Sequence, residues 1–289
     1  MTKQGWIIYR KQDADKNTTY IDWFIDECQE QNLELTLIYI EDIHIGIQNG
    51  KWDISLAGKK SIVPDFAVIR TIDPLLSKQL ELMDVAVFNS SEIARLCNNK
   101  AYTYQAMAAL GVSMVDSLFI NKERIPVESP LQPPFVVKTV SGRGGNEVMM
   151  IHTDAEWKQF ITEPQRDDLV IQSCDVELGK DLRVYVVGNQ IVGAVLRESN
   201  DDFRANFALG GNVSWYELTD QEKVVVKPII QQFDFGMVGI DFLFSREGRL
   251  LFNEIEDVVG SRMLSKVSNV NIIKEYVTFI HKKIEADNR

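Results

Sequence analysis

The chain contains few cysteines and few histidines, which excludes several kinds of site. Its 289 residues include three of each. Cys28, Cys97 and Cys174 are an odd number without metal-like or redox-like spacing, so we expect reduced thiols rather than a disulfide framework. No cysteine has a plausible histidine partner and no Ser/His/Asp pattern is present. Both observations argue against catalysis by a side-chain nucleophile.

Long apolar runs and an excess of basic residues are also lacking. No run approaches the length needed to span a bilayer, and MTKQGWIIYRKQ at the N-terminus has too short an apolar core for a secretory signal. We therefore expect a cytoplasmic protein without a membrane segment. The net charge of -11 argues against a broad basic surface for nucleic acid. With 45% hydrophobic and 25% charged residues, the chain has the composition of a globular protein with two or three domains.

The first third alternates strand-like and helical patterns, which indicates an open α/β sheet. The expected strands are GWIIYR, LELTLIYI and DFAVIRTI. Apolar residues recur at helical spacing from Tyr20 to Gln31, and Asp73-Pro74 opens a second helix. Ser90 or Ser91 is the expected N-cap of a third helix. A further helix begins at Lys100 and ends before Gly111.

A glycine-rich segment follows a predicted strand in the middle of the chain. PFVVKTV runs into SGRGG, with glycines at 142, 144 and 145, and then into the strand-like EVMMI. Such a loop lets backbone N–H groups approach phosphate oxygens, and Lys138 would emerge beside it. The pattern matches neither common phosphate-binding motif, so a glycine-rich hairpin without a ligand is the alternative. Lys100 at a helix start suits a phosphate contact or simple solvation.

Three more strands are predicted from LVIQSC, DLRVYVVG and NQIVGAVLRE. The first is apolar enough to form a wall of an adenine slot near Gln172, Ser173 and Cys174. Asp181 and Arg183 lie two apart and so share a strand face, either toward a ligand or as a surface ion pair. Further on, Arg204 and Asn206 occupy alternate positions before Gly210-Gly211, where a guanidinium and an amide suit phosphate and metal-linked groups.

Acidic residues lie near the ends of two later strand-like runs, VGIDFLF and LLFNEIED. Glu254 and Glu256 share one side of their strand because alternate residues point to the same face. A neighbouring strand would place Asp241 opposite them. Oxygen ligands of this kind suit magnesium that holds phosphates. The alternative is three solvated carboxylates.

In this order, these segments resemble the ATP-grasp superfamily, and within it the RimK-type ribosomal-protein glutamate ligases. The resemblance covers about residues 98–264. The segments that carry it are NNKAYTYQAMAALGV, PFVVKTVSGRGG, VIQSCDVELGKDLRVYVVG, DFRANFALGGNV, VGIDFLF and NEIED. The fold it implies is α/β and α+β: an N-terminal open α/β domain (1–97), an ATP-grasp lobe with the glycine-rich loop (98–172), and a second lobe with a magnesium site (173–289).

The resemblance also implies roles for individual residues. Lys100 and Lys138 would contact phosphates, and Gln172, Ser173 and Cys174 would meet adenine. Ser141 to Gly145 would form a mobile phosphate lid, with Ser141, Gly142, Gly144 and Gly145 as its nucleotide-binding residues. Asp181 would lie near the nucleotide, with Arg204 and Asn206 as an Arg-x-Asn pair. Asp241, Glu254 and Glu256 would bind magnesium, with manganese as an alternative ion. Two departures stand out, because the family usually has Asn at position 256 and small residues where Asn146-Glu147 stands.

The implied reaction is ATP-dependent formation of an amide. A carboxylate attacks the γ-phosphate of ATP to give an acyl phosphate, and an amine then displaces phosphate. Arg204 and Arg183 are the predicted catalytic residues, since positive charge offsets repulsion among the polyphosphate and carboxylate groups.

The identity of the substrates stays open. Arg70, Arg197 and Arg262 are candidates for holding a substrate carboxylate, and the acceptor amine belongs to an amino acid, a peptide or a protein terminus. A homo-oligomer is left open, and no direct binding of nucleic acid is expected. The rival hypotheses are a peptide-modifying or glutathione-synthetase-like ligase, and a nucleotide-binding protein without turnover.

Overall fold

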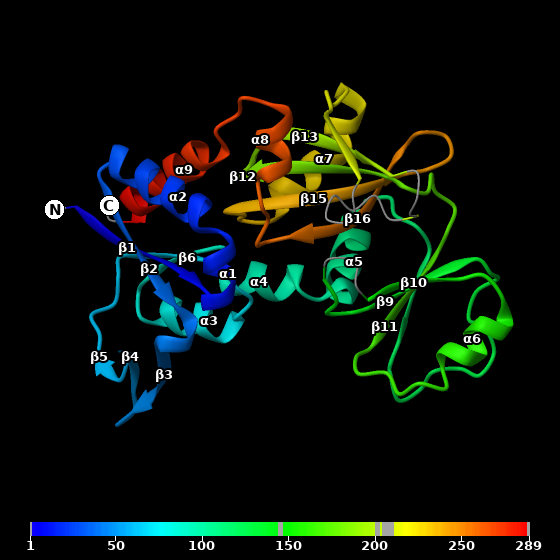
Figure 1. The fold of residues 1–289 in the computed structure, drawn as a ribbon, viewed down its shortest axis with the longest axis horizontal. Helices are drawn as coiled ribbons and strands as arrows, with labels where there is room; N and C mark the ends of the chain where they lie inside the picture. The colour runs from blue at the N-terminus through cyan, green and yellow to red at the C-terminus, as the bar shows by residue number, and fades with distance from the viewer. Residues whose placement is uncertain (1, 144–146, 200–202, 204–210, 288–289) are drawn as a thin grey trace.

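The computed structural model describes residues 2–143, 147–199, 203 and 211–287. Of the predicted site residues, Gly144, Gly145, Arg204 and Asn206 lie outside these ranges. Within them, three larger sheets follow one another along the chain, and a small antiparallel sheet is attached to the first (Figure 1).

The first sheet is parallel, with the order β2-β1-β6-β7. Its strands are β1 (Lys3–Tyr9), β2 (Leu33–Tyr39), β6 (Phe66–Ile69) and β7 (Ala86–Phe88). Residues 5–9 of β1 and all of β6 are buried, as expected when both faces of a parallel sheet are covered. The surrounding helices are α1 (Lys11–Lys16), α2 (Thr18–Glu30), α3 (Pro74–Leu82) and α4 (Ser91–Cys97).

Two predicted helix starts are confirmed by their caps. The Asp73 carboxylate accepts a hydrogen bond from the Leu76 N–H at 2.8 Å, with Pro74 as the first residue of α3. The Ser90 hydroxyl accepts one from the Ile93 N–H at 3.3 Å.

A small sheet of β3 (Ile43–Gln48), β4 (Lys51–Leu56) and β5 (Lys59–Lys60) was not predicted. Asn49 and Gly50 between β3 and β4 have φ angles of 52° and 72°. Asn-Gly is a strong hairpin signal because both residues tolerate positive φ. The turn residues Asn49 and Gly50 therefore encode this hairpin in the sequence.

The second sheet is antiparallel, with the order β10-β9-β11-β8. Its strands are β8 (Ser117–Ile120), β9 (Phe135–Thr139), β10 (Val148–Ile151) and β11 (Leu169–Ser173), and helix α6 (Asp154–Phe160) covers one face. The buried Trp157 ring packs edge-on against Phe135 with centroids 5.7 Å apart, which joins α6 to the sheet. Helix α5 (Lys100–Ala109) precedes this sheet in the chain, and Gly111 after it has a φ of 71°, as predicted for a C-terminal cap.

The third sheet is antiparallel, with the order β14-β13-β12-β15-β16. Its strands are β12 (Lys180–Val187), β13 (Gln190–Glu198), β14 (Asn212–Trp215), β15 (Met237–Phe244) and β16 (Leu250–Glu256). Helix α7 (Asp220–Gln232) contributes buried apolar residues to one cluster with this sheet, and α8 (Arg262–Val267) follows β16. The last helix, α9 (Ile272–Asp287), packs against α2 near the start of the chain (Figure 1).

The packing of α9 joins the first and last thirds of the chain. Phe24 and Cys28 of α2 belong to the same buried cluster as Tyr276 and Ile280 of α9 and Tyr185 of β12. The domain boundaries 1–97, 98–172 and 173–289 remain a prediction. No helix among the described residues combines the length and hydrophobicity needed to cross a membrane.

Candidate active site

A cavity of about 490 Å³ lies between the second and third sheets. It is bordered by residues of β9 and β11 on one side and of β12, β15 and β16 on the other. The predicted site residues that line it are Lys100, Lys138, Gly142, Gln172, Ser173, Cys174, Asp181, Arg183, Arg197, Asp241, Glu254, Glu256 and Arg262. Ser141 instead lines a smaller neighbouring cavity of about 210 Å³.

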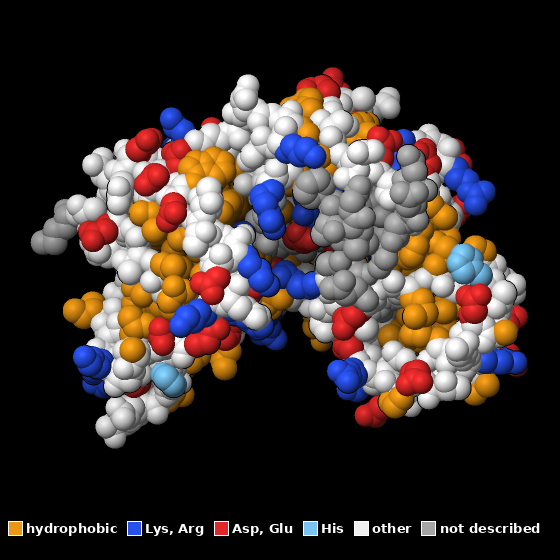
Figure 2. All heavy atoms as spheres, in the orientation of Figure 1, with side chains coloured by type: hydrophobic (Ala, Val, Ile, Leu, Met, Phe, Trp, Pro, Cys, Tyr) orange, Lys and Arg blue, Asp and Glu red, His pale blue; other side chains and the backbone are white. Residues whose placement is uncertain are grey.

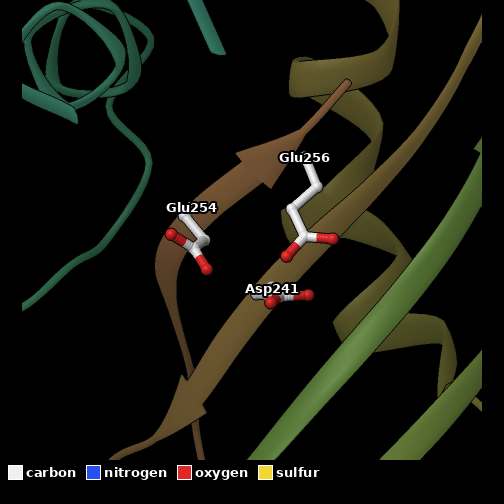
Figure 3. A group of neighbouring side chains, drawn as sticks. All are labelled: Asp241, Glu254 and Glu256. Atoms are coloured by element: carbon white, nitrogen blue, oxygen red, sulfur yellow. The ribbon is translucent and has the colours of Figure 1, made fainter. Parts of the chain in front are cut away.

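Three acidic side chains converge in this cleft (Figure 3). One carboxylate oxygen each from Asp241, Glu254 and Glu256 lies within 4.8 Å of the other two. Asp241 is opposite Glu254 in the β15–β16 ladder, and the register shifts by one residue directly after this pair. The strands therefore place the three carboxylates on one face of the sheet, with Asp241 only 1% exposed.

The group fits a single magnesium ion after small side-chain movements. Magnesium–oxygen distances of about 2.1 Å place ligand oxygens at most about 4.2 Å apart. The Glu254 and Glu256 side chains are each 31% exposed and so have room to rotate. A carboxylate has about four lone-pair sites. Arg183 and Arg197 use three of those on Asp241, which leaves one for a cation.

The acidic group is part of a buried ionic network. Arg183 donates to both oxygens of Asp241, at 2.7 and 2.6 Å, and its Nη1 lies 2.8 Å from Glu256. Arg197 donates to Asp241 at 2.7 Å and also pairs with Asp181. The alternative of a surface ion pair between Asp181 and Arg183 is wrong, because these residues are 8% and 5% exposed and each pairs with a residue on a neighbouring strand.

Burial and charge act in opposite directions in this network. Burial raises the pKa of Asp181 to about 6, although Arg197 opposes the effect. Burial alone would raise the pKa of Asp241 too, but Arg183 and Arg197 outweigh it and hold this pKa below its usual value. Asp241 therefore stays ionised, as a metal ligand must be.

The two predicted phosphate-binding lysines lie beside the acidic group. Lys100 at the start of α5 is 3.6 Å from Glu254 and donates a hydrogen bond to the Gly142 carbonyl. Lys138 on β9 donates to Asn253 Oδ1 at 2.8 Å. Burial lowers the pKa of Lys138 to about 8, with Glu254 opposing this and Lys100 adding to it. Positive groups also gather near the middle of the face shown in Figure 2.

The described part of the glycine-rich loop is held at its start. The Ser141 hydroxyl and N–H donate to Asp167 at 2.6 and 2.7 Å, and the Thr139 hydroxyl donates to Glu147 at 2.6 Å. Glu147, one of the two departures from the family pattern, thus has a partner at the base of the loop. Gly142 is required here, because an added Cβ would lie 2.2 Å from Thr139 Oγ1.

A contact from this loop reaches the third sheet. Arg143 donates at 2.9 Å to Asp257, the residue that directly follows Glu256 in the chain. Asn98 donates to the same Asp257 oxygen at 3.1 Å. Burial raises the pKa of Asp257, with Arg143 opposing the shift. The predicted lid includes Arg143, but sequence reasoning gave this residue no role of its own, since nothing in SGRGG indicates a partner far along the chain.

The predicted adenine-binding segment borders the cleft at the end of β11. Gln172 is 2% exposed, and its side chain donates to the Ser117 hydroxyl at 2.9 Å. The Ser173 N–H donates to Asp116 O, and Cys174 O accepts from the Val176 N–H. The first two bonds hold the segment against the start of β8, and all three predicted residues line the cavity.

The three arginines suggested for a substrate carboxylate have different surroundings. Arg197 is paired with Asp181 and Asp241, as described above. Arg70 is 8% exposed, donates to Val259 O at 2.8 Å and stacks over the Tyr20 ring. Arg262, in contrast, is exposed and lines the cleft at the start of α8. Arg262 is therefore the candidate that can reach a ligand without breaking a described contact.

Comparison with known proteins agrees with this geometry. The model of the RimK-like ATP-grasp domain family matches residues 97–280. N-acetylaspartylglutamate synthase A of Mus musculus is 27% identical over 263 residues, covering 85% of this chain and 69% of the relative. A probable alpha-L-glutamate ligase 2 of Shewanella amazonensis is 25% identical over 277 residues, covering 91% of each.

Solved structures share the fold. The ATP-grasp ligase PsnB, complexed with minimal precursor, Mg and ADP, superposes with a TM-score of 0.68 at 14% identity, covering 98% of each chain. The predicted mixed α/β ATP-grasp fold is confirmed, and so is the prediction of an ATP-dependent carbon–nitrogen ligase at the level of the family. The chain belongs to the RimK-like ATP-grasp family.

Proposed function

We propose that this chain joins a carboxylate to an amine in the cleft between the second and third sheets, through an acyl phosphate formed with ATP. The observation that carries the proposal is the convergence of Asp241, Glu254 and Glu256 on one cavity wall, with Lys100 and Lys138 beside them. This arrangement sets acidic groups for a divalent cation against basic groups for phosphates, as phosphoryl transfer requires.

The lysines and the buried arginines have separate tasks in this proposal. Lys100 and Lys138 contact the phosphates and offset the repulsion between the polyphosphate and the incoming carboxylate. Arg183 holds Asp241 and Glu256 in position as well as adding positive charge. The role predicted for Arg204 and Asn206 concerns residues outside the described ranges.

Asp241, Glu254 and Glu256 would hold magnesium, with manganese as the alternative ion. When bound, the cation supplies positive charge that stabilises the phosphate oxygens during transfer. Glu256 makes the site more negative than the usual Asn would. Its ion pair with Arg183 at 2.8 Å offsets that additional charge.

The substrates belong to the same proposal. Arg262 is suited to hold a substrate carboxylate because it is exposed and lines the cleft. The named relatives are synthases and ligases of glutamate compounds, and PsnB was also solved with a precursor peptide. These names support an amino acid or a peptide as the amine acceptor.

The test combines ATP turnover with identification of the product. The chain is incubated with ATP, magnesium and a mixed pool of carboxylates and amines, and ADP release and product masses are measured. Glu254→Ala should abolish product formation and leave the melting temperature nearly unchanged, while Glu163→Ala, an exposed residue outside the cleft, serves as the control. Substrate-dependent phosphate release that survives Glu254→Ala would show that the metal assignment is wrong. ATP binding without turnover would instead support a nucleotide-binding protein.

A further inference from the structure

A bulge in β16 places Asn253 in the cleft. The β15–β16 ladder pairs Asp241 with Glu254 and then Phe242 with Phe252, so Asn253 has no opposite residue. Two successive residues, Asn253 and Glu254, therefore both line the cavity. In a regular strand, successive side chains would point to opposite faces.

Asn253 contacts a lysine on the other side of the cleft. Lys138 Nζ on β9 donates to Asn253 Oδ1 at 2.8 Å, and both residues are partly buried. This hydrogen bond connects the second sheet with the third at the edge of the acidic group. It fixes the direction of an ammonium group that has several rotatable bonds.

The side-chain partner of Lys138 differs in charge from the side-chain partners of the cations around the acidic group. Lys100 lies 3.6 Å from Glu254 in addition to donating to the Gly142 carbonyl, Arg183 pairs with Asp241, and Arg197 pairs with Asp181. Lys138 instead has a neutral amide as its hydrogen-bond partner. An amide orients the ammonium group without cancelling its charge, whereas a carboxylate at the same distance would compete with a phosphate oxygen for it.

We propose that Asn253 is a positioning residue for Lys138: its neutral oxygen aims the ammonium group into the cleft and leaves the positive charge free for a phosphate of ATP. This inference rests on the proposed function. It assigns a role to Asn253, the neighbour of the predicted metal ligand Glu254, and this role requires the side chain to be uncharged.

The test is Asn253→Asp, which keeps the size of the side chain and its ability to accept a hydrogen bond. Binding of ATP with magnesium is measured by calorimetry, and the melting temperature is measured without nucleotide. A purely structural role predicts an unchanged dissociation constant, because the contact survives. The proposal predicts that the dissociation constant rises roughly tenfold to a hundredfold, as for loss of one charge-assisted contact, while the protein stays folded.

Repeating the measurement in a Lys138→Met variant separates this effect from simple repulsion between a new carboxylate and ATP. If Asp acts by capturing the ammonium group, then Asn253→Asp should change the dissociation constant little when Lys138 is already replaced, in Lys138→Met. The same large rise in both backgrounds would overturn the proposal. Asn253→Ala, which removes the acceptor, should weaken binding less than Asn253→Asp, and wild-type affinity in either variant would also overturn it. Failure of the unmodified chain to bind ATP would instead refute the proposed function.

Discussion

Arg197 provides a sharp test of the buried ionic network. Its side chain is 7% exposed and its described partners are Asp181 and Asp241. Two guanidinium groups, from Arg183 and Arg197, face three carboxylates, those of Asp181, Asp241 and Glu256. Replacing Arg197 with Met leaves one cation for three buried or partly buried anions.

The expected cost follows from burial. Breaking a buried ion pair by removing one partner typically costs about 3–5 kcal/mol, because the remaining charge is left without compensation. The unfolding entropy of 289 residues is about 0.6 kcal/mol/K at roughly 2.1 cal/mol/K per residue. Arg197→Met should therefore lower the melting temperature by about 5–8 °C.

The loss should depend on pH in a defined direction. The pKa of Asp181 is about 6 because burial raises it, with Arg197 opposing the shift. Removing Arg197 raises this pKa further, so at about pH 5 the carboxyl group takes up a proton and the penalty shrinks. The loss in melting temperature should therefore be larger at about pH 8 than at about pH 5.

A double variant identifies the cause. Arg197→Met with Asp181→Leu removes one charge of each sign, so it should melt higher than Arg197→Met alone at about pH 8. Thermal unfolding followed by circular dichroism measures both variants. The reasoning is refuted if Arg197→Met melts at the wild-type temperature, which is what a substrate-binding arginine with no structural task would show, or if the double variant melts lower than the single one.

Two further predictions concern the edge of the cleft. Arg143→Gln should raise the KM for ATP several-fold, and an unchanged KM would contradict this expectation. The stability cost should be only about 1 kcal/mol, because Arg143 is 39% exposed and solvent screens its ion pair with Asp257. Arg124→Gln, a control at an exposed position on the same lobe, should change neither the KM nor the stability. For Lys138, burial lowers the pKa from 10.5 to about 8, so ATP affinity should fall as pH rises through about 8. Without nucleotide, stability should increase as pH rises from about 8 toward 10.5, because the folded state binds fewer protons there than the unfolded state. Titrations of Lys138→Met should lack both trends, and a flat wild-type profile would show that Lys138 does not titrate in this range.

The fold was predictable wherever an apolar run or a cap was visible in the sequence. Residues 5–9 of β1, β6 and the caps at Asp73 and Ser90 depend on neighbouring residues alone, and the sequence therefore predicts them. The packing of α9 against α2 depends on contacts between the two ends of the chain. No local pattern encodes such a contact.

The site depends on strand register, and register was not predictable. In the β12–β13 hairpin, Val187 pairs with Gln190, and an unbroken ladder from that pair would place Leu196 opposite Asp181. A bulge after Tyr185 shifts the pairing by one residue, so Arg197 faces Asp181 instead. A shift of one residue exchanges the two faces of a strand. Here the shift brings the Arg197 side chain to the face that carries Asp181, and so into the ionic network.

The same argument applies to the acidic group itself. From the Phe244–Leu250 pair, an unbroken ladder would place Asn253 opposite Asp241 and turn Glu254 and Glu256 to the other face of the sheet. Alternation correctly predicts that the two glutamates share a face, but the bulge at Asn253 decides that this face is the one that carries Asp241. The residue that forms the bulge is also the hydrogen-bond partner of Lys138. The extra residue in β16 thus supplies the hydrogen-bond partner of Lys138. Deleting Asn253 would give an unbroken ladder that still places Glu254 opposite Asp241, so the deletion should remove the Lys138 contact and keep the carboxylate geometry.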